Sequence, residues 1–361
     1  MISADTVRMA AKRQVLRPVQ WALNGATKRH SDVVVFIVPG GQEISGGIIS
    51  IHDLARQSQR VGDSLGFDCR VATLPGSVPT LRHHAVPDSC PVYDFRQILN
   101  YYADPKRMVV HVPEFFVRLA KGETLLLRHL KNTSNHVDVT LNVLIQNIHK
   151  IADDERWNQF RQRCEGLALT ATTAHTAYCT PRMRERLGVP LHHFSTWISG
   201  WQYAPYRYQQ KTDCMVLSPD NSLWRADFLS SLKLSNASVT LRVIENLTYA
   251  QYLEIVRTSK WSVTFGEGLD AYFIELALSG GVPFAVFNDD FFTPEFLDLP
   301  NVFKDREEFS STFSGVFDDL TDPAYFRATS QATRDIIDSY YRYDDYVDNI
   351  ARYYAGFFDY P

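Results

Sequence analysis

The stretch that decides the fold is Trp261–Asn288, WSVTFGEGLDAYFIELALSGGVPFAVFN. It opens with an apolar run over 262–265, and a turn containing two glycines follows. Asp270 is a typical N-cap for the helix predicted after it, because the apolar residues there recur at helical spacing. Gly280-Gly281 ends this helix, and the apolar run 284–287 predicts the next strand. A strand–helix–strand unit of this kind places its two strands parallel in one sheet.

Two carboxylates lie in this unit. Glu267 is in the turn before the helix, and Glu275 is about one and a half turns inside it. The first turn of a helix has unbonded N–H groups and the positive end of the helix dipole, and both favour a phosphate. A nucleotide diphosphate would then sit on the backbone amides of Gly268, Leu269 and Asp270. Glu275 would reach the ribose hydroxyls, and Glu267 would reach a sugar beyond the phosphates.

The segment EGLDAYFIE, from Glu267 to Glu275, resembles the E-x7-E element of retaining GT-B glycosyltransferases, family 4 and its relatives. The strand before it and the Gly-Val-Pro exit after it strengthen the resemblance. In that family the element belongs to the C-terminal domain and binds the sugar nucleotide. The alternative is that both glutamates lie on the surface of an ordinary Rossmann-like helix.

Composition and charge limit the class of protein. The chain has 361 residues, of which 45% are hydrophobic and 22% charged, as in a water-soluble globular protein of about two domains. No apolar run approaches the ~18 residues of a membrane span. The five cysteines are scattered, with no C-x-x-C pair, which favours a reducing compartment. No signal peptide is recognisable, so a cytoplasmic location is expected.

The net charge of −4 argues against a nucleic-acid-binding protein. Residues 1–30, however, carry six Lys and Arg side chains against one Asp, interleaved with apolar residues. Such a basic amphipathic segment could make peripheral contact with the anionic inner face of a membrane. The other interpretation, which the sequence slightly favours, is a helix that packs on its own domain and leaves its basic face in water.

The first half of the chain begins with a second strand–loop–helix pattern. The continuous apolar run Val33–Val38 is typical of a buried parallel strand, and a helix is expected over 48–65. Between them lies a glycine-rich loop that ends in Gly46 and Gly47. This order resembles the opening of the GT-B N-terminal domain, where the loop approaches the donor phosphates or the acceptor. Two glycines also make ordinary tight turns. A dinucleotide fingerprint and a P-loop are both missing.

Repeated strand–helix units predict the fold class: α/β, with two Rossmann-like doubly wound parallel sheets. The resemblance implies a GT-B fold in which the two domains face each other across a cleft. We predict an acceptor-side domain over residues 1–205 and a nucleotide-sugar-binding domain over 206–328. Residues 329–361 are expected to form a C-terminal helix, rich in aromatic side chains, that crosses back to the first domain.

The leaving diphosphate needs positive charge. The Asp-x-Asp pair that holds a metal in the other large glycosyltransferase class is missing, so no metal and no cofactor are expected. The GT-B family usually supplies a Gly-Arg-x5-Lys motif after the first strand of the second domain. At the corresponding stretch, 218–225, Pro219 takes the Arg position and Arg225 takes the Lys position. Arg225 can still contact phosphate oxygens, but one cation fewer makes the donor and the activity uncertain.

Two residues are predicted to be catalytic. Relatives often place a histidine after a central strand, near the donor sugar, and His111 is the first candidate, with His149 as the second. A lone histidine on a strand is also commonly structural. Glu267 is expected to accept hydrogen bonds from donor-sugar hydroxyls rather than to move a proton. Retaining GT-B enzymes use front-face attack, in which the leaving phosphate helps to deprotonate the acceptor.

The resemblance implies a retaining, metal-independent glycosyltransferase. Its donor would be a nucleotide sugar and its acceptor a glycan or a lipid-linked saccharide. The expected product class is a bacterial surface polysaccharide, and this expectation rests only on what members of the family commonly make. Two alternatives stay open: a sugar-nucleotide 2-epimerase of the same fold, and a non-catalytic nucleotide- or carbohydrate-binding module.

Overall fold

The computed structural model describes residues 31–41, 45–77, 80–84, 86, 88–102, 104–118, 120–195, 205–220, 225, 228–229, 239–245 and 247–361, with the backbone alone at 120–123. The basic segment 1–30 and most of the helix expected after Arg225 lie outside these residues. The chain divides into two compact units. Unit 1 comprises Met1–Thr196 and Asp344–Pro361, and unit 2 comprises Trp197–Tyr343.

Unit 1 is built on a seven-stranded parallel sheet in the order β3-β2-β1-β4-β5-β6-β7. The central strand β1 pairs Val34 with Cys69 of β2 on one side and with Val109 of β4 on the other. Residues 33–38 of β1 are all buried, as expected for a strand covered on both faces. The strands are β1 (Asp32–Val38), β2 (Phe67–Thr73), β3 (Val92–Asp94), β4 (Arg107–Pro113), β5 (Asp138–Ile145), β6 (Ala168–Thr173) and β7 (Leu191–His193).

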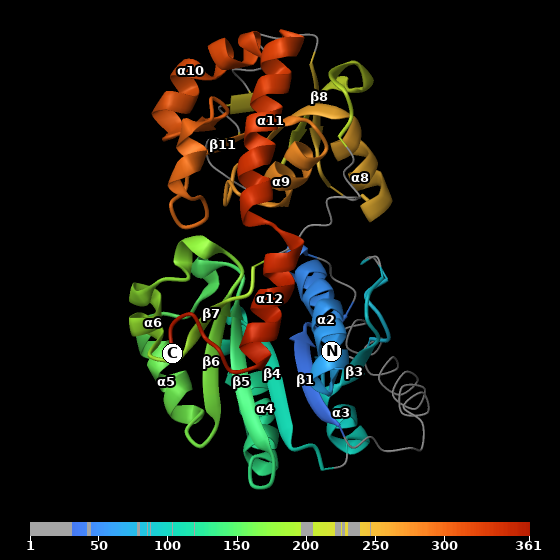
Figure 1. Ribbon diagram of the computed structural model, residues 1–361, viewed down its shortest axis with the longest axis vertical. Coiled ribbons are helices and arrows are strands. Elements are labelled where there is room, and N and C mark those ends of the chain that lie inside the picture. Colours follow the sequence, from blue (N-terminus) through green and yellow to red (C-terminus); the bar gives the residue numbers. More distant parts are fainter. Residues whose placement is uncertain are drawn as a thin grey trace, which may run out of the picture. The chain divides into compact units, whose positions relative to one another are not determined.

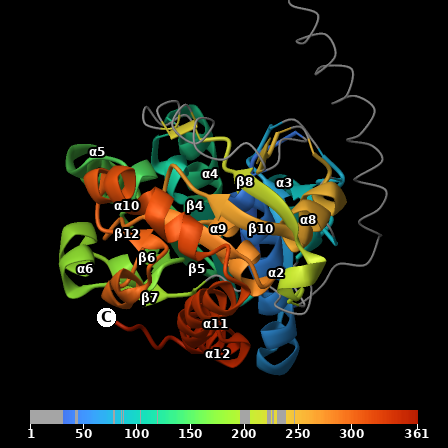
Figure 2. The same ribbon diagram turned by 90° about the horizontal axis from the view of Figure 1, so that it is seen from above.

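Helices cover both faces of this sheet (Figures 1 and 2). The long helix α2 and the C-terminal helix α12 lie on one face, and α4 lies on the other. Ser45 caps α2, accepting a hydrogen bond from the Ile48 N–H, and Gly66 ends the helix in the left-handed conformation. The α-helices of unit 1 are α2 (Gly46–Leu65), α3 (Phe95–Tyr101), α4 (Ala120–Thr133), α5 (Asp154–Arg163), α6 (Pro181–Leu187) and α12 (Tyr343–Tyr354), the last starting at the boundary residue.

Unit 2 contains a five-stranded parallel sheet in the order β12-β11-β10-β8-β9. One face carries phenylalanines such as Phe313 and Phe317 of α10, which pack against Met215, Trp261 and Phe284. The elements are β8 (Thr212–Leu217), β9 (Thr240–Val243), α8 (Tyr249–Thr258), β10 (Ser259–Val263), α9 (Ala271–Leu278), β11 (Val282–Val286), β12 (Val302–Phe303), α10 (Arg306–Asp319) and α11 (Pro323–Tyr340).

The two doubly wound parallel sheets expected from the sequence are confirmed, but some elements differ in extent. The notable limits are set by caps: α6 begins at Pro181, because Thr180 caps it through the Met183 N–H, and the chain after β12 turns into α10, because Asp305 caps that helix. The expected C-terminal helix is two helices: α11 belongs to unit 2, and α12 from Asp344 onward belongs to unit 1.

A buried polar network fixes α12 on the sheet of unit 1. His111 of β4 is 1% exposed and stacks on Phe36 at 4.3 Å between ring centroids. The Asn142 amide donates to Nδ1 of His111 (2.9 Å), so Nε2 carries the proton and donates to the Tyr354 hydroxyl (3.0 Å). Tyr354 in turn donates to Ser58 of α2. Each donor and acceptor in this network has a partner, and these hydrogen bonds offset the free-energy cost of burying the polar groups.

The residues after α12 pair with the edge strand β7. Leu191 and Tyr360 exchange two backbone hydrogen bonds of 2.8 and 3.0 Å in an antiparallel bridge. The Asp359 carboxylate accepts from the His193 N–H (2.8 Å) and lies 3.0 Å from Nδ1 of His192. The tail thereby satisfies the backbone N–H groups of Leu191 and His193 at the edge of the sheet. Among the described helices, none is long and apolar enough to cross a membrane.

Replacing Tyr354 with phenylalanine tests the network. The change leaves the His111 N–H and the Ser58 hydroxyl without their partner, and it should lower the free energy of unfolding by about 1–3 kcal/mol. Urea unfolding at pH 7.5 measures this. Tyr325→Phe is the matched control, because Tyr325 is 38% exposed, and it should stay within about 0.5 kcal/mol of the parent. Equal effects of the two changes would contradict the network.

Acidification should also destabilise unit 1. Burial lowers the pKa of His111 to about 3. An unfolded histidine titrates near 6.5, so below that pH the unfolded chain binds more protons and stability falls as the pH falls toward 3. The His111 contribution is a loss of about 2 kcal/mol between pH 7 and pH 5. Urea unfolding at the two pH values measures it, and the loss should be smaller in His111→Gln. An equal loss in both proteins would contradict the assignment.

Candidate functional site

The candidate site of unit 2 lies at the switch point of its sheet. The chain runs from β8 outward to β9, and then returns to the other side of β8 with β10. In open α/β sheets, ligands bind at the carboxyl ends of the strands where the order reverses in this way. Here the two loops that meet are residues 218–220 after β8 and residues 264–270 after β10.

Hydrogen bonds tie these two loops together. The ladder continues beyond the strands, with the Ser218 N–H donating to the Val263 carbonyl at 3.1 Å. The Ser218 hydroxyl then accepts from the Phe265 N–H at 3.1 Å. Further along, the Thr264 hydroxyl donates to the Gly268 carbonyl at 2.9 Å. The turn that carries Glu267 is therefore held by buried side chains on both sides.

Any residue other than glycine at position 268 would require the turn or its neighbours to rearrange. Its φ of +83° is in the left-handed region, and a Cβ placed there would lie 2.5 Å from a ring carbon of Phe292 and 3.0 Å from the Val286 carbonyl oxygen. Leu269 beside it is buried. The backbone of the turn thus comes close to the protein core on one side, and the conformation needed before α9 depends on a glycine.

Asp270 caps α9. Its carboxylate accepts from the Phe273 N–H at 3.1 Å and also from the Tyr272 N–H. Burial raises the pKa of Asp270 well above its usual value, and the carboxylates of Asp220 and Glu267 raise it further. Asp270 therefore occupies two amides of the first turn. A diphosphate at this helix end would sit ahead of the cap, on the amides of residues 266–270.

Glu275 lies inside α9 and is 7% exposed. Its carboxylate accepts a short hydrogen bond from the Tyr252 hydroxyl of α8. The rings of Tyr252 and Tyr272 pack edge to face at 5.8 Å, against Val216 of β8. The tyrosines thereby fix the carboxylate between α8 and α9, on the opposite face of the sheet from the phenylalanine cluster.

Arg225 lies at the same edge of the sheet. Its Nη1 donates to the carbonyls of Pro219 (3.2 Å) and Asp220 (3.4 Å), and its guanidinium is 6.0 Å from the centre of the Phe265 ring. Asp220 approaches the turn from the same direction, since its carboxylate carbon would be 3.0 Å from a Cβ at Gly266. In the part of this edge that the structure describes, the Arg225 guanidinium therefore lies among the carboxylates of Asp220, Glu267 and Asp270.

The structure thus brings six of the expected residues to one edge of unit 2. Three of them form the turn before α9, Asp270 caps the helix, Glu275 lies inside it and Arg225 comes from the segment after β8. The expectation missed two residues in contact with these: Asp220 and Tyr252. Tyr252 is 23 positions before Glu275, and only the packing of α8 on α9 places it there.

The remaining expected residues belong to unit 1. Gly46 and Gly47 begin α2, after its Ser45 cap. Gly46 is exposed with open space at its Cβ position, whereas a Cβ at Gly47 would lie 2.9 Å from Oε1 of Gln146. The Gln146 amide donates to the Gly47 carbonyl (3.1 Å), and Glu114 accepts from the Gln146 N–H (3.1 Å). These groups lie near the switch point between β1 and β4.

His111 is in the interior of unit 1. Both of its ring nitrogens are engaged, with Asn142 and Tyr354, and the ring lies under α12. A catalytic His111 would require α12 to leave the sheet first, so this role stays a prediction. Among the described residues no group of three or more His, Cys, Asp or Glu side chains is arranged to hold a metal ion.

Comparison with solved structures gives the class of the fold. The two parallel-sheet α/β units form a GT-B fold, as expected, and solved glycosyltransferases of that fold align along nearly their whole length. At the level of sequence, no protein-family model matches the chain, and no curated protein matches it.

Three of these structures illustrate the similarity. Sucrose-phosphate synthase from Thermosynechococcus elongatus has a TM-score of 0.56 at 10% identity, covering 91% of this chain and 99% of that one. Anabaena HepE in complex with UDP and glucose gives 0.55 at 9% identity, covering 91% and 100%. The α-glucosyltransferase AGT in complex with UDP gives 0.55 at 10% identity, covering 89% and 99%. AGT has also been solved with UDP-glucose and DNA.

Gly268→Ala tests the conformation of the turn. The added methyl group meets Phe292 and forces a left-handed backbone on alanine, so the free energy of unfolding should fall by at least about 2 kcal/mol. Gly315→Ala is the control: Gly315 is inside α10 with open space around it, and alanine there should raise stability by roughly 0.5–1 kcal/mol. Urea unfolding of both variants measures the difference. A neutral Gly268→Ala change would contradict the geometry described for the turn.

Proposed function

We propose that this protein is a glycosyltransferase that takes a sugar from a nucleotide-sugar donor, with UDP as the nucleotide, and transfers it with retention of configuration. The observation that carries the proposal is the edge of unit 2, where a glycine turn, the start of α9 and two glutamates lie at the switch point of a GT-B sheet. The UDP complexes of HepE and AGT support the choice of nucleotide.

In this proposal each residue at the edge has one part in donor binding. The diphosphate lies against the backbone amides of residues 266–270, ahead of the Asp270 cap, because those groups offer hydrogen bonds and the positive end of the α9 dipole. Glu275, held by Tyr252, accepts hydrogen bonds from the ribose hydroxyls. Glu267 does the same for hydroxyls of the transferred sugar.

Arg225 supplies the positive charge for the leaving group. It would turn from the carbonyls of Pro219 and Asp220 to the phosphate oxygens, where a guanidinium binds in a bidentate manner. The carboxylates of Asp220 and Glu267 repel the negatively charged diphosphate. Among the described residues of this edge, Arg225 and the backbone amides of the turn would offset that charge. No metal ion has a part in the proposed reaction.

The proposed chemistry is front-face substitution. The bond from the anomeric carbon to the phosphate oxygen breaks as the acceptor oxygen bonds to the same face of that carbon. The acceptor proton passes to the departing phosphate oxygen, which carries the electron pair of the broken bond. Glu267 contributes orientation of the sugar and not proton transfer. We place His111 with the residues that hold α12 rather than with those that touch the substrate.

For the acceptor we propose a glycan or a lipid-linked saccharide, as in the synthesis of a bacterial surface polysaccharide. The net charge of −4 opposes a polyanion such as DNA, although AGT has been solved with DNA. The basic segment 1–30 would bring the protein to the cytoplasmic face of a membrane where lipid-linked acceptors lie. The exposed start of α2 at Gly46 is the part of unit 1 that we assign to substrate.

The rival functions predict different products. A sugar-nucleotide 2-epimerase of this fold would interconvert UDP-sugars without releasing UDP, and a binding module would do neither. Incubation with UDP-glucose, UDP-galactose and UDP-N-acetylglucosamine, with and without an oligosaccharide acceptor, separates these outcomes. Free UDP that increases with acceptor supports transfer.

Substitution of the two glutamates tests the site. Glu275→Gln should weaken UDP binding by roughly tenfold or more, because it removes charged hydrogen bonds to the ribose. Tyr252→Phe should weaken binding less, since it only loosens the carboxylate. Glu267→Gln should lower turnover more than UDP affinity. Calorimetric titration with UDP and a UDP-release assay measure these effects.

The control is Glu254→Gln, a change of the same chemistry on the exposed face of α8. It should leave both UDP affinity and turnover within about twofold of the parent. The site would be refuted by UDP binding that is unchanged in Glu275→Gln and turnover that is unchanged in Glu267→Gln.

A further inference from the structure

Unit 1 contains a pair of buried histidines that the proposed function does not use. His52 belongs to α2 and His83 to the segment before β3, and their exposed fractions are 0% and 1%. Nε2 of His52 lies 2.9 Å from Nδ1 of His83. The outer nitrogens meet backbone groups: the Cys90 N–H is 3.1 Å from Nδ1 of His52, and His83 bonds to the backbone of Pro39.

These contacts determine where the proton lies on each ring. The Cys90 N–H can only donate, so Nδ1 of His52 accepts and its proton is on Nε2. That Nε2–H donates to Nδ1 of His83, whose proton is therefore also on Nε2. Because Pro39 has no N–H, His83 must donate to the Pro39 carbonyl. The result is a chain of hydrogen bonds with one direction, from the Cys90 amide through two neutral imidazoles to the end of β1.

The chain cannot accept a further proton. A proton on Nδ1 of His52 would face the Cys90 N–H, and a proton on Nδ1 of His83 would face the N–H of His52. Either one places two donors against each other and breaks a link. Burial lowers the pKa of His52 to about 4, with the charges of His83 and Arg56 acting in the same direction. Burial also lowers the pKa of His83, while its hydrogen bond to Pro39 acts in the opposite direction because a protonated ring donates more strongly.

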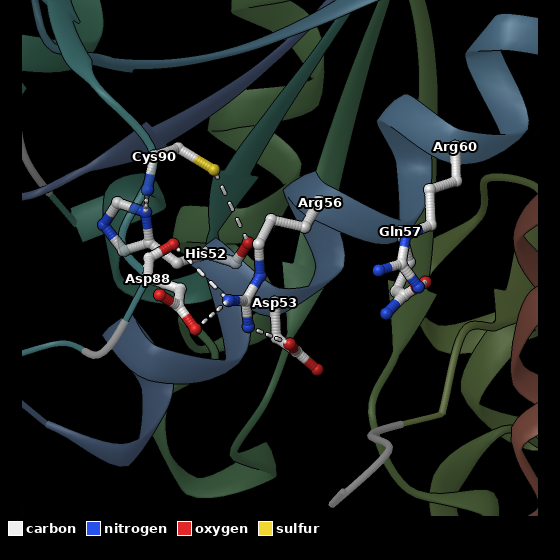
Figure 3. Close-up of polar contacts among 7 residues, drawn as sticks. All are labelled: His52, Asp53, Arg56, Gln57, Arg60, Asp88 and Cys90. Carbon is white, nitrogen blue, oxygen red and sulfur yellow. Dashed lines mark hydrogen bonds and ion pairs between the residues drawn. The ribbon is translucent and has the colours of Figure 1, made fainter.

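The charged groups around the pair do not stabilise a further proton on either ring. Figure 3 shows Arg56 of α2 between Asp53 and Asp88, and it pairs with both carboxylates. The Cys90 sulfur is turned toward the His52 carbonyl at 3.8 Å. The titratable or charged groups near the pair are Asp53, Arg56 and Arg60 from α2, Arg82, Asp88 and Cys90 from the segment before β3, and Cys69 from β2.

We infer that His52 and His83 are positioning residues that hold the turn after β1 through the Pro39 carbonyl, and that a proton on either ring breaks the hydrogen bond between the rings and shifts this anchor. Pro39 is followed by Gly40 and by Gly41, whose φ is +106°. A turn with two adjacent glycines, one of them left-handed, has little stiffness of its own, so an anchor at its first residue determines where it lies. The turn leads toward the start of α2 that we assign to substrate, and to this extent the inference rests on the proposed function.

The protonation pattern is tested by NMR on the full chain labelled with ¹⁵N-histidine and ¹⁵N-glycine. At pH 7.5 both rings should show the Nε2–H tautomer, with signals assigned through His52→Gln and His83→Gln. Between pH 7.5 and 3 the Gly40 and Gly41 amide signals should shift with the same midpoint as the imidazoles. In the double variant His52→Gln/His83→Gln, whose amides do not titrate, this shift should be lost. An Nδ1–H tautomer on either ring, or glycine signals that ignore the imidazole titration, would overturn the inference.

The effect on substrate is tested separately with UDP-glucose at pH 7.5. His83→Phe keeps a ring but has no group to hold the Pro39 carbonyl, and it should raise KM roughly tenfold with kcat changed by less than about threefold. His83→Gln retains one donor and one acceptor and should restore KM to within about threefold of the parent. An unchanged KM in His83→Phe would overturn the positioning role. If the parent protein does not use UDP-glucose, the proposed function fails, while the NMR result still decides the hydrogen-bond chain.

Discussion

The pairing of β8 with β10 is the constraint on which the candidate site depends. Two strands far apart in sequence lie side by side because the chain reverses its direction of winding between them. Their carboxyl ends then deliver two loops to one place, and the Ser218 hydroxyl joins them through the Phe265 N–H. The turn before α9, the Asp270 cap and Arg225 all take their positions from this junction.

In the proposed function, the diphosphate would lie beside several carboxylates at this junction. Asp220, Glu267 and Asp270 are close enough for the pKa of Asp270 to be raised by the other two, in addition to the effect of burial. Backbone amides and Arg225 would have to neutralise the charge of an anion bound there. The anion would compete with the carboxylates for these hydrogen-bond donors. Such a site would discriminate strongly between donors according to how their phosphates are placed.

Much of the architecture could be predicted from the sequence, because buried parallel strands such as Val33–Val38 and the E-x7-E stretch have clear local patterns. The position of Glu275 followed from helical spacing alone. What could not be predicted depends on contacts between distant segments. Tyr252 reaches Glu275 only because α8 packs on α9. The catalytic role of His111 stays a prediction. Its partners Asn142 and Tyr354 come from another strand and from α12, so no local sequence pattern could have predicted those contacts.

The tail at residues 359–361 has a consequence beyond its own packing. Strand β7 is the last of its sheet, and an uncovered edge strand offers backbone groups to any extended chain that approaches. Tyr360 already fills one such position on Leu191, and Asp359 fills the next on His193. The tail therefore competes with any approaching strand for that part of the edge.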